Sequence, residues 1–207
     1  MYIYIKEGKV IVKVPLRLKE KYIVDFKKLK SENSDVVAYI KVNNTNIEYP
    51  IVKTSNNNFY LNHSFDKSKN SRGWIFADYK NKFDNTDKNI VIYGHNMRDE
   101  SMFGSLKNIL NEEWYNNAEN KNITFLTEKG NYIYKVFSIY KIESEDYYIK
   151  TNFKNDEDYE KFLNTIKNRS IKNFDINLNI NDKIITLSTC ANNNKYRVVL
   201  HAKKVNN

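Results

Sequence analysis

Three residues of different chemical type could act together on a peptide bond. Cys190 ends the segment TLSTC (residues 186–190), Arg197 follows it at the start of the next apolar run, and His95 lies in the upstream segment YGHNM (93–97). Cysteine chemistry on an amide needs a thiolate, a carrier for the proton of the leaving amine and a donor for the oxyanion. Cys190, His95 and Arg197 could supply one each.

The strands predicted around these residues would bring them to one end of a sheet. Cys190 and Arg197 lie at facing ends of two apolar runs, 183–189 and 196–203. A hairpin joining the two runs would hold the two side chains near each other. His95 follows a further predicted strand, and the glycine before it permits a tight approach.

Cys190 is the only cysteine among the 207 residues, which excludes an intramolecular disulfide and a cysteine-based zinc site. A free cysteine is most often a small buried hydrophobe, but the TLSTC context and the accompanying histidine and arginine favour a nucleophile. No aspartate has an obvious third-member role, so motif and residue order argue against papain-like and caspase-like enzymes. His63, in a polar loop, and His201, on a strand, are predicted to be structural.

Short β-branched or aromatic runs separated by Asn, Gly, Asp and Lys predict a β-barrel. The runs cover residues 36–42, 47–52, 74–77, 89–93, 123–127, 132–140, 183–189 and 196–203. Pro50 lacks an amide donor, so we expect the second strand to be an edge strand or to be bulged there. An alternating pattern around Gly8 also favours strand structure within residues 1–18.

Apolar residues at helical spacing predict three helices. They cover residues 20–31, 101–114 and 156–169. Asn155 or Asp156 could cap the third helix, which carries on one face Tyr159, Phe162, Leu163 and Ile166. This helix lies in a long connection, 142–182, and long connections that hold their own helix usually serve a site.

Composition limits the functional class. The chain is 41% hydrophobic with a net charge of +9, and it is long enough for one domain with a core. Its basic residues are scattered, which argues against nucleic-acid binding, whereas a positive surface suits an anionic cell envelope. No apolar run reaches 18 residues and the start lacks the plan of a signal peptide, so any membrane anchor would lie upstream.

The quoted segments resemble the sortase family. The resemblance rests on TLSTC followed by an arginine, on YGHNM followed by Ser101-Met102-Phe103, and on VVAYIKVNNTNIEYPIV (36–52), and it runs from about residue 22 to residue 204. The helix before the barrel and the helix introduced by DYYIKTNF (146–153) resemble class B rather than class A. The resemblance implies a mainly β fold with helices (α+β). It comprises a closed eight-stranded barrel, an N-terminal helix and a helix inserted between strands 6 and 7.

The resemblance also implies a role for each site residue. Cys190 would attack the carbonyl after the threonine of a sorting signal and form a thioester, His95 would act as general acid and base, and Arg197 would hold the substrate and the oxyanion. An amine of peptidoglycan or its precursor would then displace the enzyme. The residues implied to bind substrate are Ser188, Tyr148, Ile149, Ser144 and Asn58.

The sequence thus predicts one sortase catalytic domain over residues 1–207, with a leader or N-terminal extension at 1–20, a helix at 21–34 and the barrel at 35–204. We expect neither a cofactor nor a metal. The acidic cluster that gives some class A enzymes a calcium site is not recognisable. Two alternatives stay open: a pilus-type sortase that joins protein subunits, and a catalytically silent barrel that binds wall peptides.

The expected partners are surface proteins with a Pro-x-Thr-type signal and a peptidoglycan amine, without nucleic acid. Contact with the membrane is expected only through an N-terminal anchor that this chain does not contain. The expected location is the outer face of the membrane, or the wall, of a Gram-positive bacterium.

Overall fold

The structure, a computed structural model, describes residues 2–6, 9–13, 23–190 and 195–205. Much of the predicted leader, at 7–8 and 14–20, lies outside these residues. Within it, β1 (Tyr2–Lys6) and β2 (Lys9–Lys13) pair as an antiparallel hairpin. The strand pattern predicted within residues 1–18 is therefore confirmed for these two segments.

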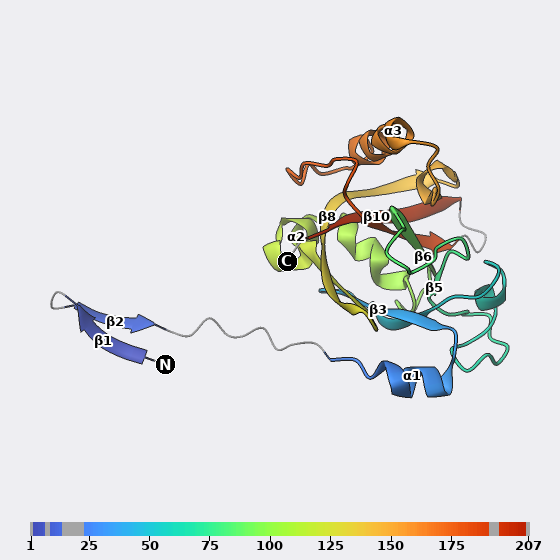
Figure 1. Cartoon of the computed structure of the whole chain (residues 1–207), viewed down its shortest axis with the longest axis horizontal. Coiled ribbons are helices and arrows are strands. Elements are labelled where there is room, and N and C mark those ends of the chain that lie inside the picture. Colours follow the sequence, from blue (N-terminus) through green and yellow to red (C-terminus); the bar gives the residue numbers. More distant parts are fainter. Residues whose placement is uncertain (1, 7–8, 14–22, 191–194, 206–207) are drawn as a thin grey trace.

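Eight strands of the described chain close into a barrel in the order β10-β8-β7-β3-β4-β5-β6-β9 (Figure 1). Their bounds are β3 Val36–Val42, β4 Glu48–Val52, β5 Phe76–Ala77, β6 Asn89–His95, β7 Asn122–Thr127, β8 Gly130–Glu143, β9 Ile184–Cys190 and β10 Tyr196–Lys204. The predicted mainly β fold and the eight-stranded closed barrel are confirmed.

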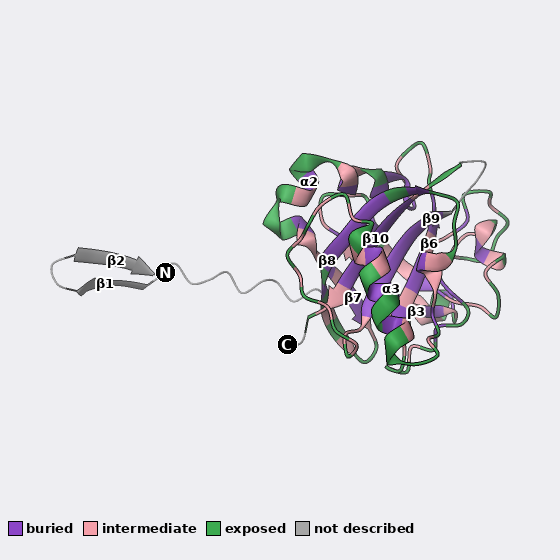
Figure 2. Ribbon diagram, turned by 90° about the horizontal axis from the view of Figure 1, so that it is seen from above, coloured by how far each residue is buried: buried purple, intermediate pink, exposed green. Residues whose placement is uncertain are grey.

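Alternating side chains fill the barrel interior. Along β3, Val36, Ala38, Ile40 and Val42 are buried while the residues between them are partly exposed. This is the period of two expected for a strand with one face on a core. Figure 2 shows the same buried band crossing the neighbouring strands, so the strands enclose one apolar core.

The bulge predicted at Pro50 is not found there, because Pro50 pairs in register with Tyr39 of β3. The register between β3 and β4 shifts between Val36 and Ala38. β4 meets β5 through one residue pair, Val52 with Phe76, which leaves Pro50 outside the ladder between those strands. A residue without an amide donor is tolerated in such a place.

α1 (Phe26–Glu32) precedes the barrel, and the side chain of Asp25 caps it by accepting a hydrogen bond of 2.9 Å from the amide of Lys28. The cap makes the helix begin later than the predicted start at residue 20, and residues 20–22 lie outside the described part. α1 and α3 (Asp156–Asn168) cover opposite sides of the barrel (Figure 1).

The prediction of one continuous helix at 101–114 was wrong. The segment forms a 3₁₀ helix, η2 (Gly104–Leu110), then an extended residue, Asn111, and then α2 (Glu112–Asn116). Phe103, Leu106 and Ile109 are fully buried. A spacing of three residues places them on one side of a 3₁₀ helix, which has three residues per turn.

The connection from β8 to β9 contains η4 (Tyr147–Ile149) and α3. β8 and β9 are the sixth and seventh barrel strands, so the inserted helix lies where it was predicted. Asn155 caps α3 by accepting from the amide of Asp158 at 2.9 Å. The buried side chains of α3 pack against the outer face of β8 in a second apolar cluster, and they are Tyr159, Phe162, Leu163 and Ile166.

Two further short 3₁₀ helices complete the described elements: η1 (Phe59–Leu61) and η3 (Ala118–Lys121). Throughout the described residues, every helix is too short or too polar to cross a bilayer.

Candidate active site

Three neighbouring strands bring the predicted catalytic residues to one edge of the barrel. In the parallel pair of β6 and β9, His95 is in register with Cys190. In the antiparallel pair of β9 and β10, Ser188 is in register with Val199, and Cys190 and Arg197 each lie two residues further toward the same edge of the barrel. Adjacent strands lie about 4.8 Å apart, so the ends of β6, β9 and β10 form one row, which carries His95, Cys190 and Arg197.

The direction of the strands explains why the row forms. β6 and β9 run parallel, so both end at the same edge, and β10 begins there. Gly94 allows the packing beneath the row. A Cβ at this position would come within 2.5 Å of the side chain of Ile75 and 2.6 Å of that of Phe103, closer than real contacts allow. The close approach predicted for this glycine is confirmed.

The imidazole of His95 is held through one nitrogen and leaves the other unbonded. Its Nε2 lies 2.6 Å from the carbonyl oxygen of Leu61, which can only accept a hydrogen bond, so Nε2 carries a proton. The side chain is 3% exposed, and Nδ1 has no hydrogen-bond partner among the described residues. In the neutral ring Nδ1 is therefore the basic nitrogen that is free to take a proton.

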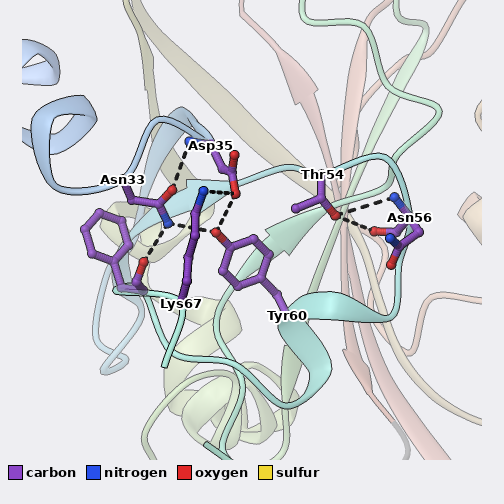
Figure 3. A network of polar contacts seen from close by, with 7 residues as sticks. Asn33, Asp35, Thr54, Asn56, Tyr60 and Lys67 are labelled. Carbon is purple, nitrogen blue, oxygen red and sulfur yellow. Dashed lines mark hydrogen bonds and ion pairs between the residues drawn. The ribbon is translucent and has the colours of Figure 1, made fainter. Parts of the chain in front are cut away.

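A polar network fixes η1, the segment that carries Leu61. The hydroxyl of Tyr60 accepts from Asn33 at 2.8 Å and donates to Asp35 at 2.8 Å. Lys67 pairs with the same carboxylate at 2.9 Å (Figure 3). Burial raises the pKa of Tyr60, which keeps its hydroxyl protonated as the donor. The network joins the end of α1 to η1 and so steadies the carbonyl that orients His95.

Arg197 is oriented by a side chain from the other side of the row. Its Nη2 donates to the hydroxyl of Ser144 at 2.9 Å. Ser144 itself is held by its amide, which donates to the carbonyl of Lys195 at 3.0 Å. Arg197 is partly exposed, and this bond fixes the direction of its planar guanidinium.

A groove of about 660 Å³ runs beside the row. It is lined by six of the residues predicted from the sequence: Asn58, Ser144, Tyr148, Ile149, Ser188 and Arg197. Leu61, which holds His95, and Thr189, which precedes Cys190, also line it. The segments around η1 and η4 form its sides, so residues far apart in sequence converge on one depression.

Tyr148 lies mostly beneath the surface of the groove and forms part of its buried base. Its side chain is 2% exposed, and its hydroxyl lies 2.9 Å from that of Ser188. Ile149, the next residue, is partly exposed. The 3₁₀ turn of η4 thus anchors itself through Tyr148 and presents Ile149 to the groove.

A buried carboxylate fixes the opposite side of the groove. Asp78 is 4% exposed, and one of its oxygens accepts from Asn57 at 2.9 Å and from the Tyr93 hydroxyl at 2.9 Å. The side-chain oxygen of Asn57 in turn accepts from the amide of Tyr79 at 2.9 Å. These bonds tie the loop that carries Asn58 to the strand that carries His95.

The other two histidines lie away from the row. His201 is fully buried, with Nε2 2.8 Å from the hydroxyl of Tyr140 and Nδ1 2.8 Å from that of Thr186. His63 stacks on Phe59 with ring centroids 4.0 Å apart, and its Nδ1 lies 2.8 Å from the Phe59 carbonyl. These contacts fit the structural roles predicted for both. Across the described residues, no three His, Cys, Asp or Glu side chains group as metal ligands do.

Sequence reasoning missed the groups that orient the row. The carbonyl of Leu61 has no side-chain signature, so no pattern could have revealed it. The polar residues Asp35, Asn57 and Asp78 gave a weak signal at most, because each lies in a turn-rich segment where such residues are common.

The comparisons with known proteins agree with this geometry. The Sortase domain family matches residues 40–205, and the chain belongs to the sortase family. Among curated relatives, Sortase B of Staphylococcus aureus is 39% identical over 165 residues, covering 80% of this chain and 67% of the relative. Sortase B of Listeria monocytogenes is 36% identical over 186 residues, covering 87% and 74%.

Solved structures point to the same class. A C232S mutant of Clostridium perfringens sortase B has a TM-score of 0.81 at 42% identity, with coverage of 87% of this chain and 86% of that one. A Staphylococcus aureus sortase B–substrate complex has a TM-score of 0.82 at 37% identity, covering 87% and 84%. The chain is thus of class B, whose reaction is transpeptidation by a cysteine.

The family further implies surface-protein substrates and cell-wall amine acceptors. Its curated relatives are from Gram-positive bacteria, which indicates a location at the cell envelope.

Proposed function

We propose that this class B sortase cuts a sorting signal after its threonine through a thioester on Cys190 and transfers the surface protein to a peptidoglycan amine. The observation that carries the proposal is the row of His95, Cys190 and Arg197 on adjacent strands beside a groove. The proposed place of action is the outer face of the membrane or the wall. Endopeptidase activity, with water replacing the amine, is the slower side reaction.

The two half-reactions divide the work among the three residues. The thiolate of Cys190 attacks the threonine carbonyl, and Arg197 stabilises the oxyanion that forms. His95 gives a proton to the departing amine as the C–N bond breaks, which leaves a thioester and a neutral imidazole. An incoming amine then attacks the thioester, its proton passes to His95, and the thiolate is released.

The free Nδ1 of His95 supports its share of this scheme. Because Nε2 is held by the Leu61 carbonyl, the proton that enters and leaves the ring does so at Nδ1. The Leu61 carbonyl also stabilises the protonated ring, since it accepts a hydrogen bond from a charged donor.

The groove suits an extended peptide. We propose that Ile149 contacts the residues before the threonine, with Tyr148 and Ser188 as the base and Ser144 and Asn58 at the sides. The proposed signal has a Pro-x-Thr core with a polar residue before the proline, and it should be cut better than a Leu-Pro-x-Thr-Gly peptide. The polar lining of Asn58, Ser144 and Ser188 supports that preference.

Fluorogenic sorting peptides, with and without amine acceptors, test the proposal. Cys190→Ala and His95→Ala should each lower turnover to a few per cent or less, because members of one catalytic unit act together. Thermal unfolding of both variants checks that the fold is retained. Substantial turnover by Cys190→Ala would overturn the assignment of the nucleophile.

The same assay separates the alternatives. If folded wild-type protein binds sorting peptides but cuts none, it is a silent barrel. If it transfers the cut peptide to a lysine of a protein subunit in preference to a wall amine, it is a pilus-type sortase.

A further inference from the structure

A second recess, of about 650 Å³, continues the substrate groove. The two share four lining residues, which mark their junction: Asn57, Tyr93, Asp146 and Ile149. Beyond the junction, one wall comes from the segment after β5 through Asp78 and Lys80. The other comes from α3 through Asp158, Lys161 and Thr165. The inserted connection therefore forms part of a longer depression than the groove alone.

The groove lies between this recess and the catalytic row. Ser188, Thr189 and Arg197 line the groove but not the recess. A peptide whose cleaved carbonyl lies at Cys190 and whose preceding residues pass Ile149 would therefore enter the recess several residues before the cleaved bond.

The charges of the recess are not balanced beyond the junction. Asp158 is paired with Lys150 at 2.6 Å, and Asp78 is buried with its oxygens bonded to neutral donors. Lys80 and Lys161 are exposed, and neither has a carboxylate partner in the part of the chain that the structure describes. Two ammonium groups, one from each wall, thus lack a carboxylate partner there, with Lys80 lying over the ring of Tyr79 and Asp146 adding one exposed carboxylate at the junction.

From this arrangement, and resting on the function proposed above, we infer that the recess binds the residues preceding the sorting signal and favours acidic side chains there. A peptide carboxylate near Lys80 or Lys161 would form a solvent-exposed ion pair. Such pairs are individually weak and are screened by salt. The recess would then sharpen the choice of substrate among proteins that carry the same core signal.

Three peptides with one Pro-x-Thr core test the inference. The first has three glutamates before the core, the second has three glutamines there, and the third has three glutamates after the cleaved bond. At low salt the first should have a kcat/KM about threefold to tenfold above the second, and the third should show no such advantage. Binding to Cys190→Ala, followed by fluorescence anisotropy, should rank the peptides in the same order.

The matched variants remove two positive charges each. In Lys80→Gln/Lys161→Gln the ratio of kcat/KM for the first peptide to kcat/KM for the second should fall to about one. In Lys27→Gln/Lys28→Gln, which changes two exposed residues of the distant α1, this ratio should stay at the wild-type value.

The outcomes separate this inference from the proposed function. Equal kcat/KM for the first two peptides, or a preference that both double variants keep, overturns the acidic subsite while leaving thioester chemistry intact. An advantage of the third peptide instead would mean that the recess receives residues after the bond. Failure of the core itself to bind or to be cut would overturn the proposed function, and the inference with it.

Discussion

At the scale of single residues, hydrogen bonds to neighbouring groups orient the imidazole of His95 and the guanidinium of Arg197. His95 is held by a backbone carbonyl and Arg197 by the hydroxyl of Ser144. The carbonyl of Leu61 engages Nε2 of His95 and leaves Nδ1 unbonded among the described residues, and the hydroxyl of Ser144 fixes Nη2 of Arg197. An arginine held in this way offers a planar fork with a defined direction, which a flexible ammonium cannot imitate.

Arg197→Lys should therefore be nearly as damaging as Arg197→Ala. We expect turnover to fall on the order of 10²-fold, the scale of losing one oxyanion donor. Steady-state kinetics with a sorting peptide measure this loss. Ser144→Ala is the comparison, because it keeps the guanidinium and removes only the exposed hydroxyl that accepts from it, and its loss should be smaller, about tenfold. Recovery of activity by lysine to within about threefold would indicate that only a positive charge is needed.

At the scale of elements, η4 separates anchoring from contact with substrate. Tyr148 is buried and bonded to Ser188, so Tyr148→Ala would open a cavity and cost roughly 3–5 kcal/mol of stability. A loss of activity in Tyr148→Ala could therefore come either from lower stability of the fold or from weaker binding of the substrate. Ile149 is partly exposed and lines the groove, so it offers the cleaner test of whether this connection contacts the signal.

Ile149→Ala should lower kcat/KM for the preferred sorting peptide by about fivefold, because a partly buried apolar contact is worth about 1 kcal/mol. The same change should also reduce the difference in kcat/KM between the preferred sorting peptide and a Leu-Pro-x-Thr-Gly peptide. Alkylation of Cys190 by iodoacetamide should be unchanged, since nucleophilicity is untouched. Ile171→Ala is the control, because Ile171 is 57% exposed in the same connection and lies outside the groove. If Ile149→Ala and Ile171→Ala change kcat/KM equally, or if neither changes it, Ile149 has no role in specificity.

The elements also show what the sequence could predict. Strand ranges and the buried face of α3 followed from local periodicity, and the antiparallel pairing of β9 with β10 followed from their short separation in sequence. The parallel pairing of β6 with β9, which brings His95 into register with Cys190, joins segments far apart in sequence and leaves no local pattern. The same is true of the Leu61 carbonyl and of the bonds between Asn57 and Asp78, because they depend on tertiary packing.

At the scale of the whole molecule, two apolar clusters share one wall of the barrel. One cluster fills the interior, and the other joins α3 and η4 to the outer faces of β8 and β10. His201, on β10, is fully buried, and its ring lies near those of Phe137 and Tyr148. A titratable group in this position links the stability of the fold to pH.

The hydrogen bonds assign the protonation of His201. Thr186 donates its hydroxyl proton to the side-chain oxygen of Asn89 at 2.8 Å, so it can only accept from Nδ1 of His201. Nε2 then accepts from the hydroxyl of Tyr140. The ring is neutral with both nitrogens satisfied, and a second ring proton would have no acceptor in this arrangement. Burial lowers the pKa of His201 to about 3.

Stability should therefore fall as the solution is acidified below neutrality. Between the unfolded pKa of about 6.5 and the folded value of about 3, the unfolded chain binds a proton at this residue that the folded chain does not. The full contribution is present above pH 6.5, and about 1.4 kcal/mol is lost on going from pH 7.5 to 5.5. Urea unfolding at both pH values measures the loss. His201→Gln should be less stable at pH 7.5 but should lose about 1.4 kcal/mol less than the wild type on acidification. An unchanged slope in His201→Gln would show that other groups carry the pH dependence.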